Sequence, residues 1–387
     1  MISISTADKV LKDYYLDVVS EQMNTSTSPF LAMVEKTSDY VFGKDVKKVV
    51  THDLNGGVVA GSETGEVPVF PGNSYAEFTL PLKNLYGSIE ISDKALRASE
   101  NNSGAVVNLL NAEMEGLLKA SKNNVARMLF GTGDTMLCTV SDNTADGVIV
   151  TDANPFYIGM YVEVHNPIGE VVSEIGVAKV VSVDKENNIV VFDKDSTLFS
   201  GSQTIHVYGA SDSELTGLKA IFSNTGTLYG LSKAQNPWLI PYTKTVSGTL
   251  TISDIQKTLD TIEERSGEQA DVIICSWAVR RVLQKLFAEN KIATEPMVLD
   301  GGYKAISYNG IPIIVDRFCP NDTMYLLNSK DFKLHQLCDW QWLESEDGKI
   351  LHKIPGKAAY SATLVKYADL LCERPCGQAK ISGITEN

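Results

Sequence analysis

Residues 52–68 read HDLNGGVVAGSETGEVP, a glycine-rich stretch that lies between two alternating runs. KDVKKVVTHDL leads into it and YAEFTLPLKNLYGSIEIS follows it, and both runs have the period-two pattern of a strand. Two strands around a loop of about twenty residues predict a long hairpin. Loops of that length are uncommon inside compact domains and usually serve a function or an interaction.

The glycines of this stretch first suggest a loop that binds a phosphate. Such a loop reads G-x-x-x-x-G-K-[ST] and leads directly into a helix. Gly56 and Gly61 have the required spacing, but Ser62 and Glu63 stand where a lysine and a hydroxyl residue belong. Glu63 and Glu66 would repel a phosphate, no helical pattern begins until past residue 90, and the later glycines recur every four residues, unlike a dinucleotide fingerprint. The sequence therefore favours a flexible hairpin tip.

Residues 104–130 predict one unusually long helix. They contain no proline and a single internal glycine, Gly116, while Ser103 can cap the start and Gly131 the end. At 1.5 Å per residue this helix would be roughly 40 Å long, so several elements would share it as a spine. Its apolar stripe consists of Val106, Leu110, Met114, Leu117, Leu118, Val125, Met128 and Leu129.

The segments before the hairpin and after the spine differ in character. Residues 6–23 place Val10, Tyr14, Val18 and Val19 on one helical stripe, which predicts a short amphipathic helix that docks elsewhere. Residues 139–209 consist of short alternating strands joined by turns such as DKENN. We expect them to form an all-β inserted domain, either a barrel or a sandwich.

From residue 214 onward helices and strands are mixed. TISDIQKTLDTIEERSG predicts a helix capped at Ser253, and ADVIICS predicts a short buried strand. Ser276 is expected to cap the next helix, WAVRRVLQKLFAEN, and Asn309-Gly310 suits a turn with positive φ. Because strand–helix alternation covers only part of this region, the predicted fold class is α+β.

Composition limits the classes of function. The 387 residues are 43% hydrophobic and 21% charged, as in ordinary globular proteins with a large core. A formal net charge of −14 argues against a surface that grips nucleic acid. The N-terminal residues show no secretory signal and no window is apolar for long enough to span a membrane. The six cysteines are therefore expected to be reduced, buried thiols.

No motif indicates catalysis, a cofactor or a metal. The five histidines lack paired spacing, no G-x-S-x-G elbow exists, and Cys372 and Cys376 have no second pair to complete a zinc ribbon. Trp340 and Trp342 lie on one face of a strand and suggest packing or an interface. What stands out is an arm, a hairpin and a spine that cannot bury themselves on their own subunit, which leads to the hypothesis that the chain assembles with copies of itself.

The order of these elements resembles the major capsid proteins of tailed bacteriophages, which have the Hong Kong 97 fold. The resemblance spans nearly the whole chain except residues 139–209. It rests on SGAVVNLLNAEMEGLLKASKNNVARMLFG for the spine, on ADVIICSWAVRRVLQKLFAEN and YNGIPIIVDRFCPNDTMYLLNSKDFKL for an axial domain, and on AAYSATLVKYADLLCERPCGQAKISGI at the end. It implies an α+β Hong Kong 97-type capsid fold with an N-terminal arm, an extended β-hairpin loop, a peripheral domain and an axial domain, to which the all-β domain is an insertion.

The resemblance also implies domain boundaries and contact residues. The domains would be an N-terminal arm (1–43), an extended hairpin loop (44–88), a first peripheral part with the spine (89–138), the β-rich insertion (139–210), the axial domain (211–322) and a second peripheral part with the C-terminus (323–387). The intersubunit contacts at the loop tip would be Asn55, Gly56, Gly57, Gly61, Glu63, Gly65 and Glu66.

The function that the resemblance implies is structural. Hexamers and pentamers of the chain would form the icosahedral shell of a virion around double-stranded DNA, assembled in the host cytoplasm without sequence-specific DNA binding and without a membrane. A separate scaffolding protein, a portal protein and a decoration protein would be its partners. The alternatives are an encapsulin, a bacterial shell of the same fold that holds enzyme cargo, and a soluble hydrolase with an appended β-domain.

Overall fold

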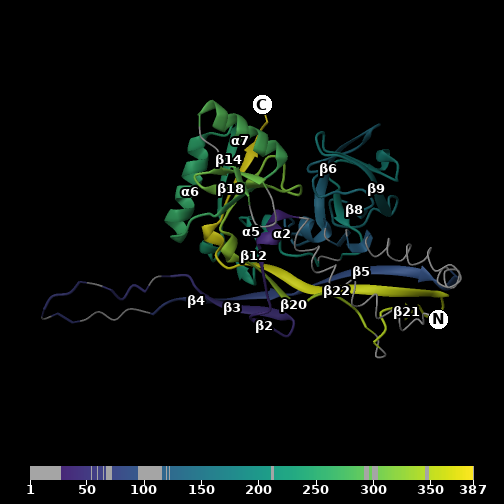
Figure 1. Ribbon diagram of the computed structural model, residues 1–387, viewed down its shortest axis with the longest axis horizontal. Helices are drawn as coiled ribbons and strands as arrows, with labels where there is room; N and C mark the ends of the chain where they lie inside the picture. Colours follow the sequence, from purple (N-terminus) through teal and green to yellow (C-terminus); the bar gives the residue numbers. More distant parts are fainter. Residues whose placement is uncertain are drawn as a thin grey trace.

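The structure is a computed structural model that describes residues 28–53, 55–58, 60–63, 65–66, 72–94, 116–118, 120–121, 123–210, 213–291, 296–298, 304–344 and 348–386. The expected N-terminal helix at 6–23 and the expected cap at Ser103 lie outside these residues. Of the expected spine, residues 116–118, 120–121 and 123–130 are described; those up to 128 are helical, and 129–130 form a turn. The described chain is a mixed α+β fold with a projecting hairpin (Figure 1).

The longest strands form a five-stranded sheet along the long axis of the molecule (Figure 1). β22 (Ala359–Cys372) pairs with β20 (Phe332–Trp342) and β21 (His352–Lys353), and also with β5 (Lys83–Ser92). β1 (Glu35–Thr37) runs parallel to β20. The sheet therefore joins segments that are more than 200 residues apart in the sequence.

One face of this sheet covers the spine. Leu85 and Ile89 of β5 and Leu364 of β22 share a buried core with Leu118 and Val125 of the spine. This arrangement follows from the sequence pattern, because alternate residues of a strand point to the same side of the sheet. The alternating apolar positions of β5 thereby meet the apolar stripe of the helix.

The hairpin predicted around the glycine-rich stretch is present. β3 (Asp45–Thr51) pairs antiparallel with β4 (Tyr75–Pro81), and β2 (Val41–Phe42) adds a third strand. The run 75–92, which reads as one strand, is in fact two strands. Leu82 separates β4 from β5, and its amide donates a hydrogen bond to the Lys44 carbonyl at 3.0 Å.

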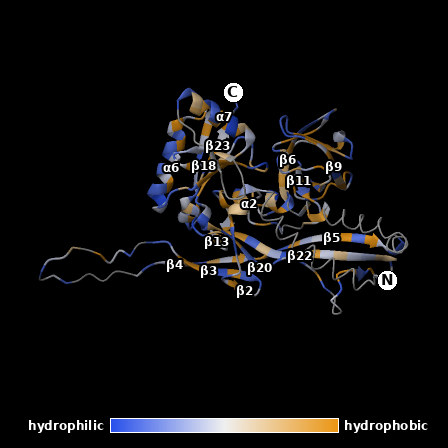
Figure 2. Cartoon of the chain, in the orientation of Figure 1, coloured by the Kyte–Doolittle hydropathy of each residue, from blue (hydrophilic) through white to orange (hydrophobic). Residues whose placement is uncertain are grey.

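A seven-stranded sheet with two helices forms the second part of the body (Figure 1). α6 (Ile252–Ser266) and α7 (Trp277–Glu289) cover one of its faces, and Figure 2 shows mostly hydrophilic residues along α6. The strands, in spatial order, are β14 (Tyr242–Gly248), β23 (Ala379–Ile384), β19 (Met324–Leu327), β15 (Val272–Cys275), β18 (Ile311–Val315), β17 (Lys304–Tyr308) and β16 (Pro296–Val298).

Both faces of the middle of this sheet are buried. Ile273 and Cys275 of β15 pack in the core beneath the helices, whereas Val272 and Ile274 belong to the core of the long sheet and the spine. A strand buried on both faces is a continuous apolar run, which is how VIIC reads in the sequence. β15 therefore joins the two halves of the body.

Local capping signals in this region are confirmed with one correction. Ser276 accepts a hydrogen bond from the Val279 amide and caps α7, and Asn309 and Gly310 have φ angles of 49° and 79° at their turn. The cap of α6 is Thr251 and not Ser253. Thr251 forms a reciprocal capping box with Asp254. Gln256, which stands where a capping-box partner of Ser253 would be, instead donates to Asp260 and accepts from Tyr308.

The expected all-β inserted domain is a closed barrel. Its buried side chains, including Phe156, Val162 and Val164, form a core of their own, separate from the cores of the body. A short 3-10 turn, η1 (Ser196–Leu198), precedes the last strand. In order around the barrel the strands are β10 (Ile189–Phe192), β7 (Gly147–Val150), β6 (Met136–Thr144), β11 (Thr204–Val207), β8 (Tyr161–His165) and β9 (Val177–Asp184).

Short elements connect these parts. They are α2 (Pro29–Met33), α5 (Leu218–Ile221), β12 (Thr227–Leu228), β13 (Leu231–Ser232), η2 (Pro237–Leu239), η3 (Ser329–Asp331) and η4 (Pro375–Gly377).

Among the described residues no helix is long and apolar enough to cross a membrane.

Candidate assembly interface

The base of the hairpin is fixed in the main core. Val46, Phe78 and Leu80, which share one face of β3 and β4, are each at most 3% exposed. The Phe78 ring lies 5.3 Å from the ring of Tyr229 and 5.9 Å from that of Trp238, measured between centroids. This face exists because the two strands alternate apolar and polar residues in register, so that their apolar side chains gather on one side.

Polar contacts reinforce this attachment. The Thr79 amide donates to the Tyr229 carbonyl at 3.0 Å. Lys48 forms an ion pair with Glu373 at the end of the long sheet, and Glu373 also lies 3.4 Å from the Lys333 ammonium. Because Lys48 and Glu373 are mostly buried, solvent screens their pair less than a pair on the open surface.

Contact with the body ends one residue beyond the paired strands. Thr51 and Tyr75 form the last pair of the ladder, and the His52 amide reaches the Ser74 carbonyl at 3.4 Å. The His52 ring stacks on Trp238 with centroids 5.1 Å apart and an interplanar angle of 4°. His52 is thus the outermost ring contact between the hairpin and η2.

The predicted contact residues lie beyond this point and are all exposed. They are Asn55, Gly56, Gly57, Gly61, Glu63, Gly65 and Glu66. Figure 1 shows the hairpin running outward from the body beyond β3 and β4. Local hydrogen bonds shape the tip: Asn55 Oδ1 accepts from the Gly57 amide at 2.8 Å, and the Gly65 amide donates to the Ser62 carbonyl at 3.2 Å.

The tip glycines are not required by a left-handed backbone. None of Gly56, Gly57, Gly61 and Gly65 has a positive φ, and a Cβ at Gly56 or Gly61 would meet open space. A strand, β4, follows the tip where a phosphate loop would continue into a helix. The glycines therefore make the tip thin and conformationally free, and they do not build a phosphate cradle.

The sequence analysis missed two features, an ion pair in the interior and the apolar outer face of the barrel. Arg127 of the spine forms a two-pronged ion pair with Glu214, with Nη1 to Oε2 at 2.9 Å, and both side chains are at most 3% exposed. The outer face of the barrel carries large apolar residues. The signal for the second feature was available, since VAKVVSVD (177–184) places valines at both strand parities.

Comparisons with known proteins agree with this architecture. The family profile of the SU10 major capsid protein matches residues 170–349. In fold, the chain is similar to the subunit in the cyanophage A-1(L) capsid asymmetric unit, with a TM-score of 0.56, 15% identity and 93% of each chain covered. It is also similar to the capsid of an empty GTA particle, with a TM-score of 0.50, 8% identity and coverage of 93% and 91%. A search of curated proteins finds no significant match.

The family match and the fold point the same way. The chain has the Hong Kong 97 fold of tailed-phage capsid proteins, and its residues 170–349 match the family of the SU10 major capsid protein. The SrpI encapsulin of Synechococcus elongatus PCC 7942 aligns over 96% of both chains, but with a TM-score of 0.47 and 11% identity.

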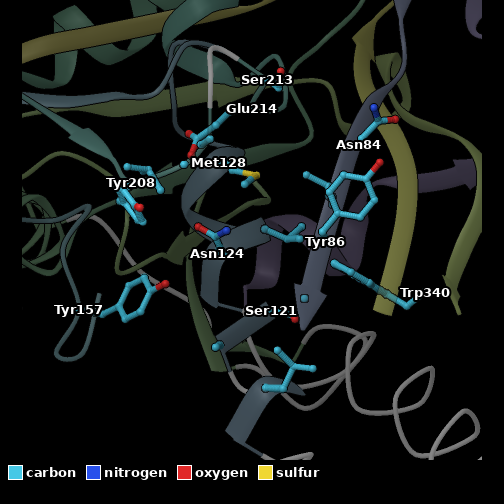
Figure 3. A pocket seen from close by; sticks show the side chains of 18 residues that line it. Asn84, Tyr86, Ser121, Asn124, Met128, Tyr157, Tyr208, Ser213, Glu214 and Trp340 are labelled. Atoms are coloured by element: carbon cyan, nitrogen blue, oxygen red, sulfur yellow. The ribbon is translucent and has the colours of Figure 1, made fainter. Parts of the chain in front are cut away.

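The matched family and the fold are those of structural shell proteins, not of enzymes. A cavity of about 430 Å³ lies between β5, the spine and the barrel. Figure 3 shows Tyr86 and Trp340 on one side of it and Tyr157 and Tyr208 on the other. Its serines have no histidine beside them in the lining, and its carboxylate, Glu214, already pairs with Arg127. Among the described residues of this lining, no histidine stands beside a serine as the base that a nucleophile needs.

The sequence predicted packing roles for the two tryptophans and for the cysteines. In the structure Trp340 and Trp342 are 6% and 5% exposed and belong to the main core. The six cysteines are free thiols, four of them buried, and burial raises the pKa of Cys275 to about 12. No group of three potential ligands that could hold a metal ion occurs among the described residues.

Proposed function

We propose that this chain builds the icosahedral head shell of a tailed bacteriophage around double-stranded DNA, and that the hairpin tip is its strap onto an adjacent subunit. One observation carries the second part of the proposal. The hairpin is buried and ion-paired at its base, yet from Asn55 to Glu66 every described residue is exposed. A segment held rigidly at one end and unburied at the other gains stability only from a second molecule.

A contact between copies of the chain is energetically favourable. Stable protein interfaces bury on the order of 1,000 Å² or more, and a projecting hairpin adds area that the compact domains lack. In a closed shell each hairpin meets the same neighbour, so one modest contact is repeated throughout the assembly. Because glycine has no side chain, the extended backbone of the tip can lie close to a neighbouring surface.

The domains have corresponding proposed roles. The arm (1–43), the hairpin loop (44–88) and the insertion (139–210) would reach neighbouring subunits. The peripheral domain would be formed by residues 89–138 and 323–387, which contain the spine and the strands β20, β21 and β22 of the long sheet. Residues 211–322 would be mainly the axial domain, together with β19 and β23, which pair in the seven-stranded sheet. Axial domains would meet around the centres of pentamers and hexamers.

The charge of the chain suits a container for DNA. With a formal net charge of −14, the subunit would enclose DNA without binding a particular sequence. We propose assembly in the bacterial cytoplasm, with a separate scaffolding protein, a portal protein and a decoration protein as partners. A gel-shift experiment at physiological salt should show only weak DNA binding by the isolated subunit, and tight binding would contradict this part of the proposal.

The role of the strap is tested by deleting residues 56–66 from the full chain. The variant should stay folded and soluble, by circular dichroism and gel filtration, because every described residue of this stretch is exposed. Wild-type protein should give closed shells in negative stain and sedimentation velocity, whereas the deletion should give none that are stable. A matched control replaces 56–66 with a glycine–serine linker of equal length, which separates loop length from loop contacts.

The capsid role and the role of the strap can fail separately in this experiment. If the wild-type chain forms no shells together with its scaffolding partner, the capsid role itself is wrong. If the deletion variant forms robust shells of full size, the capsid role stands and the assignment of the strap is wrong.

A further inference from the structure

The barrel exposes more large apolar side chains for its length than the rest of the described chain does. Of the eighteen large apolar side chains that are exposed in the described part of the chain, nine lie between residues 136 and 208. The barrel already has a closed core of its own, so these residues are not needed to hold it together. Contiguous exposed apolar surface of this kind marks an interaction site.

Six of these side chains lie on the outer face of β8 and β9 or in the segments that adjoin β8, β9 and β11. The inward residues of β8, Val162 and Val164, are fully buried, which places its alternate residues outside. Partners in an antiparallel ladder share a face, and Tyr161 pairs with Lys179 while His165 pairs with Val171. The six are Tyr161, Ile168, Val171, Val177, Val181 and Tyr208, and we call this surface the barrel face.

Ring stacking and polar contacts hold the side chains at the centre of the barrel face in place. The rings of His165 and His206 stack with centroids 4.1 Å apart and an interplanar angle of 18°. His165 Nε2 lies 3.2 Å from Glu163 Oε1, and His206 Nε2 lies 2.9 Å from Thr204 Oγ1. Side chains fixed by such contacts lose little freedom when a partner covers them.

The two ends of the barrel face are complementary to each other. At one end, the turn between β8 and β9 presents Ile168, which is 83% exposed, beside the acidic residue Glu170. At the other end lie the rings of Tyr161 and Tyr208, with the Lys179 ammonium 5.8 Å from the centroid of the Tyr161 ring. One end thus offers an aliphatic tip and a negative charge, and the other offers aromatic rings and a positive charge.

A two-fold axis through this surface would bring opposite ends together. In such an isologous contact residue i meets residue j twice, so two copies of Ile168 would meet two pairs of tyrosines. Glu170 of one copy would face Lys179 of the other, again twice. A subunit with a net charge of −14 repels its own copies in general, so a locally balanced, self-complementary patch is the surface on which they can meet.

We propose that the barrel face pairs with the barrel face of a second copy across a two-fold axis of the shell. The inference rests on the shell-forming role proposed above, because the shell supplies the second copy at high local concentration. It is independent of the hairpin, since the barrel and the hairpin base belong to different sheets and different cores.

A charge exchange in the full-length chain tests the pairing. Lys179→Glu or Glu170→Lys alone would place like charges opposite each other at both contacts, and each should raise the critical concentration for shell assembly several-fold. The double variant restores opposite charges and should return to within about two-fold of wild type. Lys194→Glu, an exposed barrel lysine at the end of β10, is the matched control and should assemble normally.

The outcomes distinguish this inference from the proposed function. Wild-type shells together with unaffected single variants, or a double variant without recovery, would overturn the barrel pairing and leave the capsid role intact. A photo-crosslinker at Ile168 in shells of isotopically mixed subunits supplies the direct readout. Adducts should join residue 168 of one copy to the region of Tyr161 and Tyr208 of another, and adducts within one chain, to the body, or to a different protein of the virion would contradict the proposal.

Discussion

The hairpin and the barrel extend from the body by opposite means. The hairpin is held through its base, where Phe78 and Leu80 belong to the main core, and every described residue from Asn55 to Glu66 is exposed. The barrel closes on itself around Phe156 and its neighbours and leaves apolar residues such as Ile168 outside. In the proposal made above, the hairpin is a strap whose contact forms on the neighbour, whereas the barrel offers a preformed surface. One chain would then hold its copies together in two ways, through an extended segment and through a closed domain.

The largest predicted effect separates the two cores. Phe78→Ala should lower the stability of the body, and Phe156→Ala that of the barrel, each by about 3–5 kcal/mol, because both rings are at most 1% exposed and leave a cavity. Differential scanning calorimetry of the subunit should show two transitions, each shifted by only one substitution. Val58→Ala, at an exposed site in the tip, should shift neither. A single transition that both phenylalanine variants lower equally would show that the barrel is not a separate unit.

The second prediction concerns the junction between spine and barrel. Arg127→Met leaves Glu214 buried without its partner and should cost about 3–5 kcal/mol, measured by urea unfolding. Arg127→Met combined with Glu214→Leu removes both charges and should recover most of that loss. If the double variant is as unstable as the single one, the pair is not the source of the effect.

A third, smaller effect depends on pH. Asp369 in β22 is fully buried and accepts hydrogen bonds from the Thr216 amide at 2.6 Å and the Thr216 hydroxyl at 3.0 Å. Burial raises its pKa to about 7 from an ordinary value near 4. The folded state therefore binds a proton that the unfolded chain has already lost, and this contribution to stability disappears as pH rises from about 4 through 7.

Asp369→Asn should remove that dependence. An asparagine can still accept from the Thr216 amide, so the variant should fold. Between pH 5 and 7 the free energy of unfolding of the wild type should fall relative to the variant, by at most about 1.4 kcal/mol per pH unit for one proton. Parallel pH profiles for the two proteins would show that Asp369 stays charged. Asp331, whose pKa burial raises to about 6, contributes the same sign to both profiles.

The smallest effect lies at the base of the hairpin, in two adjacent lysines. Lys47 pairs with Glu77 at 3.5 Å with both side chains about half exposed, so Lys47→Ala should cost less than about 0.5 kcal/mol. Lys48→Ala breaks the more buried pair with Glu373 and should cost more, on the order of 1 kcal/mol. Urea unfolding in low and high salt should show that only the Lys47 effect vanishes with added salt. Equal costs would mean that the hairpin base is no more firmly held than an exposed strand.

The sequence predicted features that depend on adjacent residues better than features that depend on pairing between distant segments. Local signals were sufficient for the hairpin strands, for the Ser276 cap and for the Asn309-Gly310 turn, since each depends on a few adjacent residues. The cap of α6 was wrong because Thr251 and Ser253 both suit a cap. Each has a polar residue three positions later that could complete a capping box, Asp254 or Gln256, so the local signal does not choose between them. The division of 75–92 into two strands depends on where β5 pairs.

Long-range pairing was beyond the reach of the sequence. The partner of β5 is β22, so nothing near residue 82 shows that β4 and β5 belong to different sheets. Likewise, a barrel differs from a sandwich by the closing pairs of β9 with β8 and with β10, which alternation alone does not specify. The tip residues could be predicted as exposed because they are polar or glycine, but the neighbour that covers them remains a proposal.

The most direct test of the strap is a photo-crosslinker at Val58, which is 91% exposed. Shells are assembled from equal amounts of ¹⁴N- and ¹⁵N-labelled subunits, irradiated and digested, and the crosslinked peptides are measured by mass spectrometry. The account predicts that half of the adducts from residue 58 join a light peptide to a heavy one, as random mixing of copies requires. Adducts that join only peptides with the same label would show that the hairpin folds back onto its own subunit, and would contradict the account.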